Sequence, residues 1–118
     1  MSWWVYLVGN LETEQCVNVP HHSEGGSHVV GGCEEAELNI TYNYSPHYRK
    51  HLDKDKGLQW CHKKVAASTI GRLEQAVGAL GTQKDEDYWQ PSPGNAGFAL
   101  SIMLEWAKLH PEAVWLVR

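Results

Sequence analysis

Hydrophobic and polar residues alternate along the first third of the chain, as they do in β-strands that have one buried face. The clearest run is 36–44, where Leu38, Ile40, Tyr42 and Tyr44 are separated by polar residues. Residues 3–8 and 15–19 are further strand candidates, and 28–30 is a short one after a loop at 21–27. This pattern predicts an antiparallel sheet, within about residues 3–44, that has one face packed on helices.

A helical period replaces the alternation after residue 44. Ser45 and Pro46 supply a cap and a first-turn proline for a short helix at 46–52. Two long helices are predicted at 63–80, before Gly81, and at 95–110, before Pro111. Residues 58–60 fit a turn or a brief strand, and 113–117 fit a last strand that returns to the sheet. The chain is therefore predicted to be one α+β domain over 1–118, in which an antiparallel sheet packs on two main helices.

Length, charge and cysteine usage exclude several classes of protein. The 118 residues match one domain, and their Trp and Tyr content is sufficient to close a core. The net charge is −4 and the basic residues form no stripe, so we expect no duplex nucleic acid as a partner. The apolar runs are too short to span a membrane. Three cysteines without a CxxC pair, and an opening run at 2–8 without a basic lead, favour a reduced, cytoplasmic protein.

The sequence contains no recognisable catalytic or metal-binding motif. GxSxG, phosphate-loop and HExxH patterns are absent. His47 and His51 share a face of the predicted short helix, but no carboxylate or thiolate accompanies them at the spacing of a zinc site. The acidic pairs, such as Glu34 and Glu35, are interpreted as solvent-facing charge in loops. We therefore expect no catalytic residues, no metal, no cofactor and no enzymatic activity.

The segment 87–97 is the first candidate for a binding site. Tyr88 and Trp89 are able to stack on a base, and they precede the mouth of the second long helix. The N-terminus of a helix attracts anions, and Gly94 and Gly97 would let a ligand approach the backbone. The alternative is a helix start in which Asn95 is the N-cap and Gly97 permits close packing.

The polar face of the predicted strand 36–44 is the second candidate. Asn39, Thr41 and Asn43 form a ladder that amide groups can use to bind the edge of a base or a peptide. The alternative is a solvated sheet face. The two candidates would support each other if Asn43 and Asn95 lay close together in the fold.

Three stretches of the sequence resemble a known group of proteins. They are the run ELNITYNYSPHY at 37–48, the run PGNAGFAL at 93–100 and the run WAKLHPEAVW at 106–115. Together they resemble a family of small uncharacterised proteins encoded in phages, prophages and bacteria, over roughly residues 24–118. In layout alone, the chain is similar to phage Thoeris anti-defence proteins, which place an antiparallel sheet before helices and assemble to trap cyclic-nucleotide immune signals. This second resemblance implies a sequestering role and assigns no residues.

These observations predict a non-catalytic accessory protein of the phage type, in the host cytoplasm, that binds a small phosphorylated or nucleotide-like ligand. The expected ligand-binding residues are the following seven: Asn39, Asn43, Tyr88, Trp89, Gly94, Asn95 and Gly97. The alternative is a protein–protein interaction module that inhibits or adapts a host complex, as anti-CRISPR-like inhibitors do, with Trp3, Trp4 and Trp115 as anchors. Under either hypothesis we expect a homo-oligomer, because pairing of chains covers the edges of a short sheet.

Overall fold

The computed structural model describes residues 1–22 and 33–118, and for His21 it describes the backbone alone. The strand candidate at 28–30 and most of the predicted loop at 21–27 lie outside the described residues. The architecture is α+β, as the sequence predicts.

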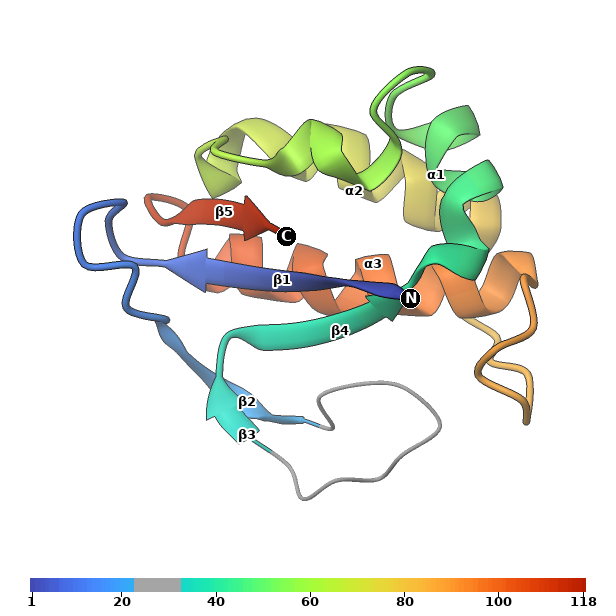
Figure 1. Ribbon diagram of the computed structural model, residues 1–118, viewed down its shortest axis with the longest axis horizontal. Helices are drawn as coiled ribbons and strands as arrows, with labels where there is room; N and C mark the ends of the chain where they lie inside the picture. The colour runs from blue at the N-terminus through green and yellow to red at the C-terminus, as the bar shows by residue number, and fades with distance from the viewer. Residues whose placement is uncertain (23–32) are drawn as a thin grey trace.

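The main sheet has three antiparallel strands in the order β4-β1-β5. The central strand is β1 (Ser2–Val8), which pairs with β4 (Glu37–Thr41) on one side and with β5 (Val114–Val117) on the other. The C-terminal strand therefore returns to the N-terminal sheet, as expected. A second, two-stranded sheet joins β2 (Asn18–His22) to β3 (Cys33–Glu35) and projects from the lower edge of the molecule in Figure 1.

The helices cover one face of the main sheet and enclose the core with it. They are α1 (Ser45–His51), α2 (Ala66–Leu80) and α3 (Pro93–Leu109), and α3 runs behind β1 in Figure 1. The core takes alternate residues of β1, namely Trp3, Val5 and Leu7, and packs them against the apolar sides of α2 and α3. Trp106 and Trp115 are among its largest fully buried side chains.

Two strands have different bounds from those that the alternation predicted. The strand predicted at 15–19 begins later, and β2 continues through Pro20, which is tolerated there because the β2–β3 register is irregular between Asn18 and His22. The predicted strand 36–44 ends at Thr41, and Tyr42–Tyr44 form a 3₁₀ turn, η1. Thr41 starts that turn, because its side-chain oxygen accepts a hydrogen bond from the Asn43 amide at 3.2 Å.

Both long helices also begin at different residues from those predicted. Helix α2 begins at Ala66 because the preceding residues pair with β5, where Lys63 N–H donates to Trp115 O at 2.7 Å. Helix α3 begins at Pro93, two residues earlier than predicted. Residues 58–60, predicted as a turn or brief strand, lie within a second 3₁₀ turn, η2 (Gly57–Cys61).

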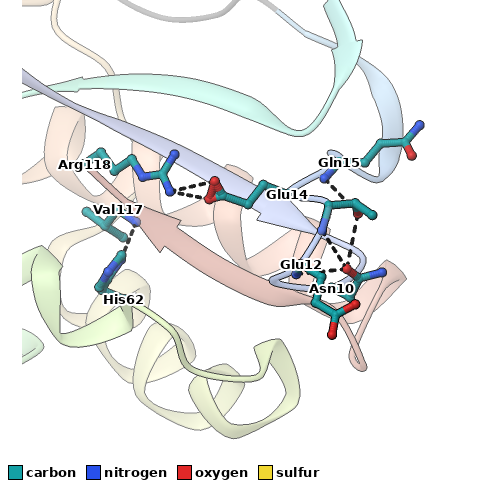
Figure 2. Close-up of polar contacts among 8 residues, drawn as sticks. Asn10, Glu12, Glu14, Gln15, His62, Val117 and Arg118 are labelled. Carbon is teal, nitrogen blue, oxygen red and sulfur yellow. Dashed lines mark hydrogen bonds and ion pairs between the residues drawn. The ribbon is translucent and has the colours of Figure 1, made fainter.

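A structured loop connects β1 to the strand segment at Cys16. Asn10 Oδ1 accepts hydrogen bonds from the amides of Glu12 and Thr13, and Glu14 forms an ion pair with Arg118 at the end of β5 (Figure 2). The loop closes with an antiparallel bridge between Val8 and Cys16. Among the described residues, no helix is long and apolar enough to cross a membrane.

Candidate functional site

The two candidate segments of the sequence meet in the fold. Asn43 Nδ2 donates to Trp89 O at 2.8 Å, Tyr88 OH donates to Asn39 O at 2.8 Å, and His47 Nε2 lies 2.8 Å from Pro91 O. These contacts hold the loop at 85–92 against β4, η1 and α1. We call them, with the hydrogen bonds of Tyr44 and Asn95 described below, the loop-docking network.

Aromatic rings reinforce this docking. The Tyr88 ring lies edge-on to Tyr44, with 5.7 Å between centroids, and edge-on to Trp89 at 5.4 Å. Tyr44 OH also donates a hydrogen bond to Tyr88 O. Burial raises the pKa of Tyr44 well above its usual value, with smaller contributions from Tyr88 and Asp87, so the phenol stays protonated as a donor. Trp89 keeps 40% of its surface exposed, so part of its indole remains accessible.

Asn95 is a structural residue in this arrangement. It is only 5% exposed, its Oδ1 accepts from Asp85 N–H at 2.8 Å, and its Nδ2 donates to Asp87 O and to Gln90 O, each at 3.0 Å. The three bonds fold the 85–92 loop around one amide. The N-cap of α3 is Ser92, whose Oγ accepts from Asn95 N–H at 3.2 Å, so the prediction of Asn95 as N-cap was wrong.

Gly94 and Gly97 permit a close approach of protein backbone. A Cβ atom at Gly94 would lie 1.8 Å from Gln83 O, and one at Gly97 would lie 1.8 Å from Gly81 O. The chain that leaves α2 therefore occupies the space beside both glycines. Close packing against this chain is therefore a sufficient reason for glycine at both positions.

The mouth of α3 offers an anion little access. Ser92 caps the first turn, and the chain at 81–83 lies against it. The nearby loop adds the acidic residues Asp85, Glu86 and Asp87, whose charges oppose a phosphate. Of the seven expected ligand-binding residues, Asn43 and Trp89 are the two that are exposed.

Side chains also cap the outer edge of the main sheet. Tyr88 OH donates to Asn39 O, and His22 Nε2 lies 2.9 Å from Glu37 O, so two carbonyls on the edge of β4 have side-chain partners. The Asn39 amide turns toward the N-terminus, where it donates to Ser2 Oγ at 2.7 Å and to Trp3 O at 3.2 Å. The two amides of the predicted ladder therefore have different partners. Asn39 binds residues at the start of β1, whereas Asn43 binds the 85–92 loop.

A further cluster of polar side chains was missed by the sequence interpretation. One ligand atom from each of Cys33, Glu35 and Glu37 lies within 4.8 Å of the others. Burial raises the pKa of the Cys16 thiol to about 11, and the nearby charges of Glu37, Glu35 and Cys33 add to this shift. The acidic pair at 34–35 was assigned to a loop, but Glu35 belongs to β3, and the i, i+2, i+4 spacing of the three residues was the available signal.

The tryptophans proposed as interface anchors differ in exposure. Trp3 and Trp115 belong to the core, which excludes them as surface anchors, whereas Trp4 is 37% exposed. Trp4 stacks on Tyr6, with 6.5 Å between centroids and an interplanar angle of 21°, on the sheet face opposite to the core. An open cavity of about 360 Å³ lies elsewhere, along the outer side of α3, and is lined by Ser101, Leu104, Glu105, Lys108 and Leu109.

Comparison of the chain with protein-family models, with curated proteins and with solved structures finds no match in any of the three.

Proposed function

We propose that this chain is a non-catalytic accessory protein of the phage type that acts by binding a partner protein, as an inhibitor or adaptor of a host complex. The observation that carries the proposal is the stacked pair Trp4 and Tyr6 on the sheet face that points away from the core. Trp and Tyr are the residue types that most often dominate the energy of protein interfaces.

The surroundings of this pair indicate the chemistry of the partner. Trp4 lies opposite Asn39, and Tyr6 lies opposite Glu37 in the neighbouring strand. The anchor therefore has a polar and acidic rim, and the chain as a whole carries a net charge of −4. Such a surface is complementary to an apolar pocket bordered by Lys or Arg side chains.

The test uses the full chain and two matched tryptophan variants. Tagged protein captures partners from a bacterial host lysate, and each candidate is then purified and its Kd measured by calorimetry. Trp4→Ala is expected to weaken binding at least about 30-fold, the loss of an interface hot spot of about 2 kcal/mol. Trp89→Ala, which removes an equally large ring from another surface, is expected to leave the Kd unchanged.

Two results would count against this function. One is a purified partner that binds wild type and Trp4→Ala with the same Kd. The other is the recovery of no saturable partner from any host lysate. Circular dichroism of the Trp4→Ala variant checks that the loss reflects the surface and not the fold.

The second candidate function is the binding of a small phosphorylated or nucleotide-like ligand, possible because an exposed part of the Trp89 indole lies beside the Asn43 amide. The base would stack on Trp89, and its phosphate would lie outside the capped mouth of α3. Protein purified from cells that produce signalling nucleotides is denatured and the released compounds are identified by mass spectrometry. A stoichiometric phosphorylated compound that is lost in Trp89→Ala but kept in Trp4→Ala would replace the first proposal with this one.

Self-association remains part of both hypotheses. Because His22 and Tyr88 cap two carbonyls of β4, a second copy would have to displace these side chains to extend the sheet there. Sedimentation velocity at increasing protein concentration tests the expectation, and a monomer at every concentration would contradict it.

A further inference from the structure

One end of the molecule presents two surfaces of opposite charge. Helix α1 lies at the upper right of Figure 1, and the connection from α2 to α3 lies at the lower right. Helix α1 and the turn after it form the basic surface, which consists of four exposed residues: Arg49, Lys50, Lys54 and Lys56. The 85–92 loop forms the acidic surface, which consists of three exposed residues: Asp85, Glu86 and Asp87.

Oppositely charged neighbours do not cancel either surface. Two acidic residues, Asp53 and Asp55, lie among the four cations, and Asp53 Oδ2 accepts hydrogen bonds from the amides of Asp55 and Lys56 at 3.0 and 2.7 Å. The basic surface therefore keeps an excess of positive charge. Beside the acidic surface, the Lys84 ammonium lies over the Phe98 ring of α3, 4.4 Å from its centroid. The acidic surface likewise keeps an excess of negative charge.

Lys50 projects from the side of α1 that faces the loop. It lies three residues after His47, so the two side chains share one side of the helix. His47 Nε2 lies 2.8 Å from Pro91 O in the 85–92 loop. Burial lowers the pKa of His51, and the charges of Lys50 and His47 lower it further, as expected beside a surface of positive potential.

Glu86 lies at the tip of the acidic surface. The residues on either side of it are held by Asn95, which accepts from Asp85 N–H and donates to Asp87 O. The Glu86 side chain is exposed between these two fixed points. Among the residues that the structure describes, neither Lys50 nor Glu86 forms an ion pair. The two surfaces therefore adjoin each other without neutralising each other.

The same end of the molecule also exposes aromatic surface. Trp89 is 40% exposed and Tyr42 is 39% exposed. The two residues belong to adjoining segments, because Asn43, which follows Tyr42, donates to Trp89 O. Exposed Trp and Tyr rings supply the apolar contact that charge pairs alone do not provide in an interface.

We propose that this end is the interface of a symmetric dimer, in which the basic surface of each copy binds the acidic surface of the other. A two-fold axis between the two surfaces brings Lys50 of each copy to Glu86 of the other, so the same contact forms twice. A second copy fits better than a nucleic acid, because the acidic surface would repel phosphates beside the basic one. The dimer also leaves intact the side chains that cap the edge of β4.

The experiment exchanges the two charges in the full chain and measures the dimer Kd by sedimentation equilibrium. Lys50→Glu and Glu86→Lys are each expected to raise the Kd at least about tenfold, because like charges then meet at both contacts. An equimolar mixture of the two variants is expected to restore the Kd to within about threefold of wild type, because opposite charges meet again at both contacts of the mixed dimer. The wild-type Kd is expected to rise with NaCl concentration.

Two charge reversals elsewhere serve as matched controls. Lys108→Glu and Glu112→Lys change the net charge by the same amounts, but they lie at the opposite end of α3 from the 85–92 loop. Each is expected to change the dimer Kd by less than about twofold. Circular dichroism of every variant confirms that the fold is present.

Three outcomes would overturn the proposal. They are a wild-type chain that stays monomeric at every concentration, a dimer that keeps its Kd in Lys50→Glu or Glu86→Lys, and a mixture of these variants that associates no better than each alone. All readouts use the purified chain without a partner protein and with Trp4 intact, so a failure here is distinguishable from a failure of the proposed function.

Discussion

Polar side chains gather at both ends of β4, and the two groups differ in chemical composition. At the C-terminal end, the loop-docking network pairs each donor with an acceptor, as when Asn43 and Tyr88 join the sheet to the 85–92 loop. At the N-terminal end, Cys33, Glu35 and Glu37 bring a thiol and two carboxyl groups together, with one polar atom of each within 4.8 Å of the others.

This difference separates a hydrogen-bonded network from a group of neighbouring carboxylates. A network whose donors and acceptors balance stabilises the fold, so the removal of a member costs stability. Carboxylates that lie close together repel one another, so the removal of an exposed one relieves repulsion. Four substitutions test whether the two ends of β4 behave in these opposite ways.

The largest effect is expected for Gly97→Ala, at the helix start that packs beside the loop-docking network. Its Cβ would lie 1.8 Å from Gly81 O, so α3 must move away from the chain that leaves α2. Overpacking of this kind costs about 3 kcal/mol or more in the free energy of unfolding. Urea denaturation measures the loss. Gly78→Ala is the control, because its Cβ meets no atom within 4 Å, and helix propensity predicts a gain of about 0.5–1 kcal/mol there.

Asn95→Ala is expected to lower the free energy of unfolding by about 2–3 kcal/mol, because it leaves one amide and two carbonyls of the 85–92 loop without their partner. Asn43→Ala removes one exposed hydrogen bond and should cost under about 1 kcal/mol. Thermal denaturation of both variants decides the order. Equal losses would mean that Asn95 does not organise the loop.

Tyr88→Phe tests the capped edge of the sheet. The substitution keeps the ring contacts with Tyr44 and Trp89 and removes the hydrogen bond to Asn39 O, at a cost of about 1 kcal/mol. Chemical denaturation measures the cost, and sedimentation velocity shows whether the uncapped edge promotes association. A variant as stable as wild type would show that water replaces the phenol without loss.

The smallest effect is expected at the other end of β4, and it has the opposite sign. Glu35→Gln removes one exposed charge from the group of Cys33, Glu35 and Glu37 and should raise the free energy of unfolding by a few tenths of a kcal/mol. Glu34→Gln provides the baseline for a carboxylate that points away. A loss of stability in Glu35→Gln larger than that in Glu34→Gln would show that Glu35 has a structural role after all.

Several residues singled out in the sequence occupy special positions in the fold, but the structure gives some of them roles other than those predicted. The segment 87–97 was identified as unusual, and its Asn95 and Gly97 do have special environments. The sequence marked these glycine and asparagine residues as unusual. It did not identify their partners, because those partners lie in loops, which have no periodic pattern. The i, i+2, i+4 spacing of Cys33, Glu35 and Glu37 was overlooked because the acidic pair at 34–35 was assigned to a loop, whereas Glu35 belongs to β3.

The sequence by itself determined the local elements. Alternation predicted β1 and most of β4, the apolar stripe predicted α2, and Ser45 with Pro46 predicted α1, because each depends on contacts within a few residues. The tertiary structure decided how these elements were used. Tyr42–Tyr44 left the strand pattern once Tyr44 was buried beside Tyr48, and a face that looked suited to a ligand became a surface on which a loop docks. The physical reason is that each polar group must find its partner in space, and those partners lie far away in the chain.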